Sequence, residues 1–262
     1  MRELARELLA AFETGQAVAE LPSTRDASFD MDAACAVEAE IARLRVAAGH
    51  ALAGRKVGYA NKAMWRVLKL ESLVWAHMYD DTVRFAAGSG TTELSLRNCR
   101  SPKIEPEVVF KLRRPVAAGL DAATVLDAVE WIAIGFEIID CPFPGWQFKP
   151  VDFVAALGLH KGLIIGPPSP IRDLNISDLM NQLAAFKLRL LKNGEMVEEG
   201  FGRNSLRSPA LCLAELRSIT TLADGEIIST GTLTAAQPLA PGEIWSVEVE
   251  GLPVSNLALR TQ

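Results

Sequence analysis

The sequence of 262 residues predicts an α+β protein, with helices gathered near the start and strands dominating the last third. Residues 2–14 and 31–47 repeat apolar side chains at helical spacing. Residues 131–136 and 163–166 are instead short apolar runs, typical of buried strands. Hydrophobic residues make up 49% of the chain, which predicts a sizeable packed core rather than disorder.

Composition narrows the class of function and the setting. The formal net charge of −5 argues against nucleic acid as a partner, since such proteins cluster positive charge. No apolar run reaches the roughly 18 residues of a membrane-spanning helix. Acids within the first helix argue against a signal peptide. Four well-separated cysteines without a C-x-x-C pair argue against zinc and favour a reduced, cytoplasmic setting: Cys35, Cys99, Cys141 and Cys212. We predict one domain over 1–262, including a small helical region at 1–52.

The elements of the first half follow from local pattern. Residues 54–59 are a short, basic, β-leaning segment, and 62–71 are predicted as a short helix. A strand is expected around 104–110, and Asp121 is a good N-cap for a helix over 122–130. The loop 140–150 is rich in proline and aromatic residues, and loops of this kind on a rigid scaffold often line sites.

The last third is predicted to be rich in strands. Asn193-Gly194 between two β-prone runs predicts a hairpin, because this pair favours the tight turns that join antiparallel strands. Ser208-Pro209 predicts the start of a helix over 210–221. The expected strands are 184–191, 196–199, 226–234, 243–249 and 255–260.

A pair of carboxylates in the strand around 104–110 is the first candidate site. Strand side chains alternate between faces, so Glu105 and Glu107 point the same way and Pro106 points to the other face. Like charges side by side are costly unless a cation lies between them, and Mg²⁺ accepts carboxylate oxygens. Pro106 removes a ladder donor and so predicts an edge, a bulge or a strand start. The alternative is an exposed pair on a solvated strand face.

Lys56 and Glu137 extend this candidate site. A lysine that begins a buried strand is unusual, because lysine is rarely buried without a partner. Lys56 is therefore the candidate catalytic residue, and the alternative is a surface lysine whose ammonium reaches solvent. Glu137 closes the buried run 131–136, where a carboxylate needs a cation or several donors. It is the candidate for a third metal ligand.

Other polar residues are weaker candidates. Asp80-Asp81 is typical of a turn. His160 could serve the site, although a lone histidine at a turn is more often structural. The glycine and hydroxyl groups of 230–234 could meet a substrate carboxylate, and the alternative is a threonine-rich strand end.

Taken in order, these motifs resemble the fumarylacetoacetase-like superfamily, specifically its branch of 2-keto-4-pentenoate hydratases and 4-oxalocrotonate decarboxylases from aromatic meta-cleavage pathways. The resemblance covers almost the whole chain. Each motif is weak by itself, and the ordered set is specific. The motifs are Gly54-Arg55-Lys56-Val57-Gly58, Asp80-Asp81, Ile104-Glu105-Pro106-Glu107, Glu137-Ile138-Ile139-Asp140, Trp146 with Lys149 and Asp152, Lys192-Asn193-Gly194-Glu195, Ser229-Thr230-Gly231-Thr232-Leu233-Thr234 and Pro241-Gly242-Glu243.

The resemblance implies the fumarylacetoacetase C-terminal-like fold, a mixed, rolled β-sheet with flanking helices. It implies Mg²⁺ or Mn²⁺ on Glu105, Glu107 and Glu137, with Lys56 acting near the substrate. The substrate would be a 2-hydroxy-dienoate or 2-oxo acid that chelates the metal. A homo-oligomer is implied, with association to a paralogous hydratase or decarboxylase known among relatives. The predicted substrate-binding residues are Lys56, Asp81, Asp140, Trp146, Lys149, His160 and Thr232.

The implied chemistry is that of a lyase. A cation chelated by a 2-oxo carboxylate stabilises the enolate that hydration and decarboxylation share, and Lys56 beside it would have a lowered pKa. Hydratase activity is the first expectation, and 4-oxalocrotonate-type or oxaloacetate-type decarboxylation are alternatives. An acylpyruvate C–C hydrolase ranks lower, because the sequence holds no His-x-x-Glu. A catalytically inactive partner subunit is the remaining alternative, and the intact glutamates argue against it.

Two departures from the family pattern bear on the substrate. Cys141-Pro142 follows Asp140 where the family has Ser-Arg, and Ala155-Ala156-Leu157-Gly158 stands where it has Ala-Asp-Asn. A buried unpaired carboxylate is heavily penalised. The pocket is therefore predicted to favour a monoacid with an alkyl or aryl tail over a diacid. Nearby aromatic residues support this prediction: Phe143, Trp146, Phe148 and Phe153.

Overall fold

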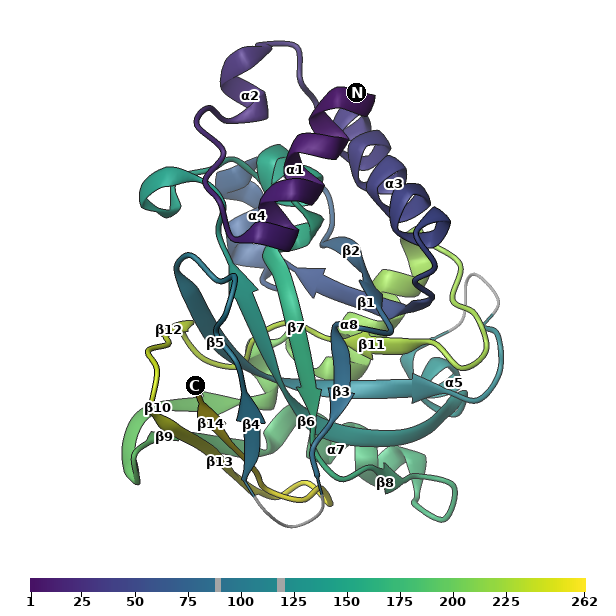
Figure 1. Cartoon of the computed structure of the whole chain (residues 1–262). Coiled ribbons are helices and arrows are strands. Elements are labelled where there is room, and N and C mark those ends of the chain that lie inside the picture. Colours follow the sequence, from purple (N-terminus) through teal and green to yellow (C-terminus); the bar gives the residue numbers. More distant parts are fainter. Residues whose placement is uncertain (88–90, 117–120) are drawn as a thin grey trace.

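The computed structural model describes residues 1–87, 91–116 and 121–262. Its N-terminal part is helical and lies at one end of the molecule (Figure 1). This part holds α1 (Arg2–Thr14), α2 (Pro22–Arg25) and α3 (Met31–Ala47). The Asp30 side chain accepts a hydrogen bond from the Ala33 N–H and caps α3. The predicted helices over 2–14 and 31–47 are confirmed. Within the described ranges, none of the helices has the length and apolar character needed to cross a bilayer.

The larger sheet is mixed and curls through the centre of the molecule (Figure 1). Its strand order is β2-β1-β11-β5-β6-β7-β3, with β12 beside β5 and β8 beside β6. β1 pairs with β11 in parallel, whereas β5 and β6 form a long antiparallel pair at the centre. The strands are β1 (Leu52–Gly58), β2 (Val74–Tyr79), β3 (Val83–Phe85), β5 (Pro102–Leu112), β6 (Val129–Asp140), β7 (His160–Ile165), β8 (Ser169–Pro170), β11 (Ile227–Ser229) and β12 (Gln237–Pro238). This confirms the predicted α+β class with a mixed, rolled sheet.

The smaller sheet is formed mostly by the C-terminal third. Its order is β10-β9-β13-β14-β4. The predicted hairpin at Asn193-Gly194 is confirmed, and both residues have positive φ, 52° and 86°, as the tight hairpin turn requires. The expected strand over 184–191 begins later, because 176–185 is helical. The strands are β4 (Thr92–Leu94), β9 (Lys187–Lys192), β10 (Glu195–Phe201), β13 (Ile244–Glu250) and β14 (Leu257–Thr261).

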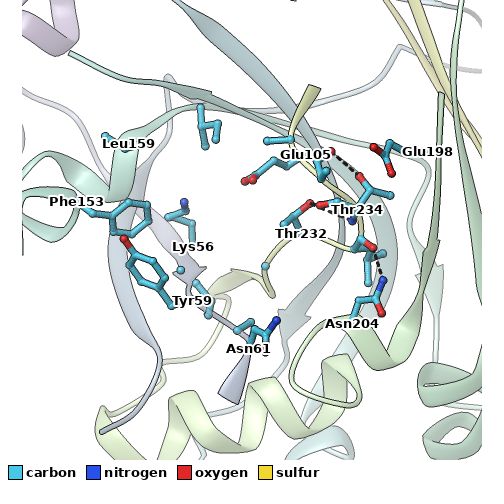
Figure 2. A pocket seen from close by; sticks show the side chains of 18 of the residues that line it. Lys56, Tyr59, Asn61, Glu105, Phe153, Leu159, Glu198, Asn204, Thr232 and Thr234 are labelled. Carbon is cyan, nitrogen blue, oxygen red and sulfur yellow. Dashed lines mark hydrogen bonds between the residues drawn. The ribbon is translucent and has the colours of Figure 1, made fainter. Parts of the chain in front are cut away.

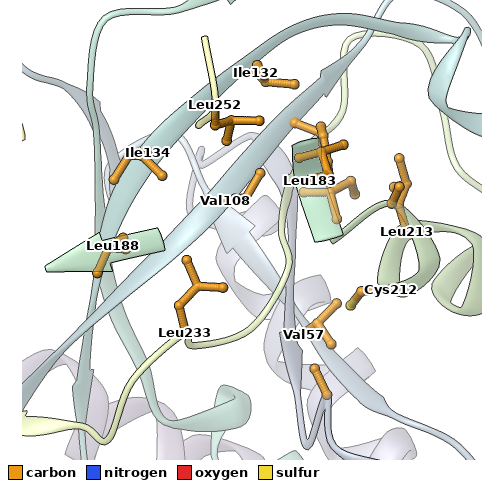
Figure 3. Close-up of a cluster of buried hydrophobic side chains, with 14 of the residues drawn as sticks. Val57, Val108, Ile132, Ile134, Leu183, Leu188, Cys212, Leu213, Leu233 and Leu252 are labelled. Atoms are coloured by element: carbon orange, nitrogen blue, oxygen red, sulfur yellow. The ribbon is translucent and has the colours of Figure 1, made fainter. Parts of the chain in front are cut away.

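The main hydrophobic core fills the space between the two sheets and the helices α7 and α8 (Figure 3). Val108 of β5 and Leu188 of β9 belong to it, together with Leu183 and Leu213 from the two helices. Ser208 accepts a hydrogen bond from the Ala210 N–H and starts α8, as predicted. The remaining helices and 3-10 turns are α4 (Lys62–Leu68), α5 (Ala122–Leu126), α6 (Pro150–Ala155), α7 (Ile176–Ala185), α8 (Pro209–Ile219), η1 (Pro144–Trp146), η2 (Leu157–Leu159) and η3 (Gly202–Asn204).

A second apolar cluster fastens the N-terminal helices to the sheet. Val37 and Ile41 of α3 are buried in it with Val154 of α6 and Tyr79 of β2. α6 leads directly into the turn Leu157–Leu159 and then into β7. The N-terminal helices therefore pack against the segment formed by α6 and the turn Leu157–Leu159, and this segment contacts β1.

Pro106 does not mark an edge, a bulge or a strand start, as the sequence predicted. It lies in the middle of β5, a central strand with β6 on one side and β11 and β12 on the other. Its carbonyl accepts a hydrogen bond of 3.0 Å from the Leu233 N–H, on the side where the ladder is interrupted between β11 and β12. The missing N–H of proline faces this same interruption, so a central strand tolerates it here.

Candidate active site

Three glutamates on the central strand pair form a compact cluster. Glu105 and Glu107 lie on β5, and Glu105 is directly opposite Glu137 of β6. Each of the three can place a carboxylate oxygen within 4.8 Å of the others. Glu107 and Glu137 are 0% exposed, whereas Glu105 is partly open to a cavity. The alternative of an exposed, solvated Glu-x-Glu pair is therefore wrong.

Each of the two buried carboxylates has one oxygen held by the protein and one presented to the cluster. Glu107 Oε2 accepts hydrogen bonds from Ser229 Oγ at 2.6 Å and from the Gly231 N–H at 2.8 Å. Glu137 Oε1 lies 2.9 Å from His160 Nδ1. Glu107 Oε1 is buried and has no hydrogen-bond donor among the described residues, whereas Glu137 Oε2 has only the ammonium of Lys56 beside it, at 3.2 Å. A buried oxygen is rarely left this way unless something else satisfies it, so the donor set fits a hard divalent cation.

The electrostatics of the cluster lead to the same conclusion. Burial, together with the charge of the neighbouring glutamates, raises the pKa of Glu105 and of Glu107 to about 8. Burial also raises the pKa of Glu137. Three carboxylates that resist ionisation near neutral pH are costly by themselves, and a cation between them would relieve the repulsion.

Lys56 faces this cluster from β1. Its side chain is 2% exposed, which rules out the alternative of a lysine that reaches solvent. Lys56 Nζ donates a hydrogen bond of 2.8 Å to the Gly158 carbonyl and lies 3.2 Å from Glu137 Oε2. Burial lowers the pKa of Lys56, but the three carboxylates outweigh burial and raise it. The sequence predicted a lowered pKa for Lys56, on the assumption that a metal cation lies beside it. The carboxylate cluster by itself has the opposite effect.

A left-handed turn positions the acceptor for Lys56. Leu157, Gly158 and Leu159 all have positive φ, at 57°, 61° and 58°. Such a conformation is costly for residues with a side chain and tends to be kept where the surrounding structure uses it. Here it aims the Gly158 carbonyl at the ammonium of Lys56.

A cavity of about 610 Å³ opens beside Lys56 and Glu105 (Figure 2). Phe153, Tyr59 and Leu159 lie on one side of it. Phe148, whose ring centre is 6.1 Å from that of Phe153, and Trp146, 6.4 Å from Phe148, extend this apolar wall. The opposite wall is polar and is formed by Thr232, Thr234, Asn204 and Glu198. The cavity therefore has an apolar wall, a polar wall and the carboxylate cluster beside it.

The structure brings together some of the predicted site residues. Lys56, Glu105, Trp146 and Thr232 line the cavity, and Glu107 and Glu137 lie beside it. Trp146 Nε1 donates to Ser101 Oγ at 2.9 Å. The ring is therefore fixed at the cavity wall.

Other predicted substrate-binding residues lie outside the cavity lining. Asp81 forms an ion pair with the buried Arg45, and Asp140 accepts hydrogen bonds from the backbone N–H groups of Arg100 and Ser101. The Lys149 N–H donates to Asp152 in the first turn of α6. His160 lies behind Glu137, and burial lowers its pKa to about 3, so its imidazole is neutral.

Several cavity residues were not among the sequence candidates. Tyr59 follows the Gly-Lys segment directly, and its position next to Lys56 could have been a signal. Asn61, Glu198 and Asn204 give no such signal, because they come from an N-cap, from β10 and from η3. The predicted strand over 226–234 ends at Ser229, and the following loop brings the Gly231 N–H to Glu107.

The curled mixed sheet with its glutamate cluster defines the class of protein. Residues 60–258 match the fumarylacetoacetate (FAA) hydrolase C-terminal family, and the chain belongs to this family. It is 31% identical to 2-keto-4-pentenoate hydratase 1 of Dechloromonas aromatica (strain RCB), over 94% of this chain and 91% of that protein. It is 29% identical to 4-oxalocrotonate decarboxylase of Pseudomonas sp. (strain CF600), over 82% of this chain and 80% of that protein.

Solved structures support the fold. The structure of 4-oxalocrotonate decarboxylase from Pseudomonas putida G7, complexed with magnesium and adipate, aligns with a TM-score of 0.89 and 23% identity. The alignment covers 100% of this chain and 97% of that chain. A fumarylpyruvate hydrolase from Pseudomonas aeruginosa, in complex with Mn²⁺ and pyruvate, aligns with a TM-score of 0.63 and 18% identity, over 79% of this chain and 88% of that chain. The predicted resemblance to this superfamily and to its hydratase and decarboxylase branch is confirmed.

Proposed function

We propose that this protein is a divalent-metal-dependent hydro-lyase that hydrates a 2-hydroxy-dienoate monoacid. The observation that carries the proposal is the buried glutamate cluster with Lys56 beside a cavity, in a chain related to proteins named 2-keto-4-pentenoate hydratase. A 2-hydroxy-dienoate carries a carboxylate and a C2 oxygen at one end and a conjugated tail at the other. The cluster suits the first end, and the aromatic wall suits the second.

Mg²⁺ or Mn²⁺ is the proposed cofactor, held by Glu105, Glu107 and Glu137. The partnerless buried oxygen of Glu107 supports this choice, as does an all-carboxylate donor set. Such a cation supplies a Lewis acid that stabilises negative charge on the C2 oxygen of the substrate. Two solved structures of similar fold are described as complexed with magnesium and with Mn²⁺.

The chain's own residues would perform the remaining steps. The Lys56 ammonium would bind the substrate's C1 carboxylate end, give a proton to carbon during ketonisation and regain one from the C2 hydroxyl, since it lies beside the cluster at the cavity. Phe153 and Phe148 would exclude bulk water from the conjugated tail. Asn204 and Thr234 on the polar wall would orient the water that adds to the remaining double bond.

The charge of the cavity supports a monoacid substrate. Of the described lining residues, Lys56 alone is cationic, whereas Glu105, Glu198 and Glu199 are acidic. Arg203 does not line the cavity, and its guanidinium lies 4.1 Å from the centre of the Phe201 ring. A second carboxylate would therefore meet acidic groups instead of a cation. Decarboxylation of a diacid such as 4-oxalocrotonate remains the second candidate, favoured by the 4-oxalocrotonate decarboxylase relative.

The test is a side-by-side assay of a 2-hydroxy-dienoate monoacid and the diacid of equal chain length, with Mg²⁺ or Mn²⁺ present. Loss of the conjugated absorbance reports hydration, and released CO₂ reports decarboxylation. We expect kcat/KM for the monoacid to exceed that for the diacid roughly tenfold or more, because an unpaired carboxylate costs several kcal/mol to desolvate. A clear preference for the diacid, with CO₂ release, would move decarboxylation to first place.

We also propose a cytoplasmic homo-oligomer. Cys35, Cys99, Cys141 and Cys212 are free thiols, which supports a reducing compartment. Light scattering coupled to size-exclusion chromatography measures the oligomer directly, and co-purification would reveal a paralogous partner.

A further inference from the structure

We infer that His160 is a positioning residue. It fixes the orientation of the Glu137 carboxylate, which is a metal ligand in the proposed function, and it does not contact substrate. This inference rests on the metal site of the proposed function. His160 is 2% exposed and is not part of the cavity lining. Its two ring nitrogens are both engaged, with Nδ1 2.9 Å from Glu137 Oε1 and Nε2 2.9 Å from Thr82 Oγ1.

Because of this contact, the two oxygens of the Glu137 carboxylate have different roles. Oε1 is held by His160 Nδ1, and Oε2 is presented to the cluster. Glu107 is arranged in the same way, since Ser229 and Gly231 hold its Oε2 and leave its Oε1 presented. The imidazole of His160 therefore fixes one oxygen of Glu137, just as the Ser229 hydroxyl and the Gly231 backbone amide fix one oxygen of Glu107.

The hydrogen-bond geometry assigns the tautomer of His160. To hold an ionised Glu137, Nδ1 must carry the proton and donate it to Oε1. Nε2 of the neutral ring is then an acceptor, so the Thr82 hydroxyl must donate to it. The Tyr79 N–H donates to the same hydroxyl oxygen at 3.1 Å and fixes its position. The Thr82 hydroxyl also lies 3.1 Å from the Tyr79 carbonyl, and in this tautomer it donates its proton to His160 Nε2 instead.

A local irregularity in β7 aims the ring. The register between β6 and β7 shifts between Ile138 and Ile139, so that Ile138 pairs with Gly162 and Ile139 with His160. Lys161 is the extra residue of this bulge, and its ammonium lies 4.9 Å from the centre of the Phe12 ring on α1. A bulge turns neighbouring side chains in different directions. Here it sends His160 toward Glu137 and Lys161 toward the N-terminal helix.

The test measures Mn²⁺ binding by calorimetry on chelator-treated protein, so that it does not depend on turnover. His160→Asn keeps an N–H donor near the position of Nδ1, whereas His160→Leu has a similar volume and no donor. We expect His160→Leu to raise the Kd for Mn²⁺ roughly 10- to 100-fold, the usual effect of losing a hydrogen bond to a metal ligand. His160→Asn should recover most of that loss.

His77 offers a matched control. Its Nδ1 lies 2.9 Å from Glu38 Oε1, so it forms a similar histidine–glutamate contact outside the cluster. His77→Leu should leave the Kd for Mn²⁺ within about twofold of the wild type, because Glu38 is not a metal ligand. A similar loss in His77→Leu would mean that the effect of His160→Leu reflects general destabilisation and would overturn the inference.

The outcomes separate this inference from the proposed function. Wild-type protein that does not bind Mn²⁺ overturns both. Wild-type binding with equal Kd values for His160→Leu and His160→Asn overturns only the role of His160. If thermal melts show that His160→Leu does not fold, a comparison of Mn²⁺ binding by Thr82→Val and Thr82→Ser tests the inference instead. Thr82→Val should bind Mn²⁺ more weakly than Thr82→Ser, which keeps the hydroxyl, and equal Kd values would overturn the inference.

Discussion

Replacing Gly158 by alanine should strongly lower the catalytic activity while leaving metal binding intact. A Cβ on Gly158 would lie 2.9 Å from Lys56 Cδ and 3.2 Å from Ala76 Cβ. Ordinary carbon contacts are about 3.5–4.0 Å, so Lys56 would have to move by about 0.6 Å or more. Misplacement of a reacting group by about 1 Å can cost roughly 100-fold in rate. We therefore expect kcat/KM to fall roughly 10- to 100-fold, while the Kd for Mn²⁺ stays near that of the wild type.

The control must separate displacement of Lys56 from backbone strain. Gly158 has a φ of 61°, and alanine in this left-handed region costs about 1–2 kcal/mol wherever it occurs. Gly194→Ala supplies the same kind of strain at a φ of 86°, with no described atom within 4 Å of the new Cβ. The assay is steady-state hydration by both variants, with thermal melts to compare stability. Gly158→Ala with kcat/KM within twofold of the wild type, or an equal loss in Gly194→Ala, would refute the reasoning.

Three further predictions concern the cluster and its lysine. Lys56→Ala should lower turnover roughly 10²- to 10⁴-fold, as expected for losing an acid–base group, and calorimetry should show Mn²⁺ affinity largely intact; a rate within twofold of the wild type would contradict this role. Removal of metal by EDTA should abolish activity and added Mg²⁺ or Mn²⁺ should restore it, whereas full activity in verified metal-free protein would be fatal to the proposal. The third is pH dependence. Since the pKa values of Glu105 and Glu107 are raised to about 8, both carboxyls are mostly protonated at pH 7, and a cation must displace these protons. The apparent Mn²⁺ affinity should therefore rise from pH 6 to pH 9, with proton release detected by calorimetry in two buffers, and a flat profile would count against the cluster as the binding site.

The three clustered glutamates were predictable because short-range alternation places them. Glu105 and Glu107 share a face whatever the neighbouring strands are, and Glu137 ends a run whose apolar character already predicted burial. The hairpin at Asn193-Gly194 was predictable for a similar reason, since its turn residues act locally. Predictions from local sequence patterns were therefore correct where the structure depends on a single element.

The surroundings of Lys56 could not be predicted in this way. Leu157 and Leu159 adopt positive φ without glycine at either position, so no residue type announces the turn that holds the ammonium. Glu198 and Asn204 reach the cavity only because the smaller sheet packs beside the larger one. Pro106 misled the prediction, because the interruption between β11 and β12 that accommodates it comes from residues distant in the chain.

The placement of β11 between β1 and β5 has a consequence for how the protein acquires its activity during synthesis. The donors that hold Glu107 lie 122 and 124 residues further along the chain. At ribosomal rates of about 5–20 residues per second, they emerge roughly 6–24 s after the glutamate itself. During that interval a nascent β5–β6 hairpin would hold mutually repelling carboxylates without their donors. Metal capture should therefore come late in folding, and Mn²⁺ uptake by a refolding chain would report closure of the sheet rather than its first pairing.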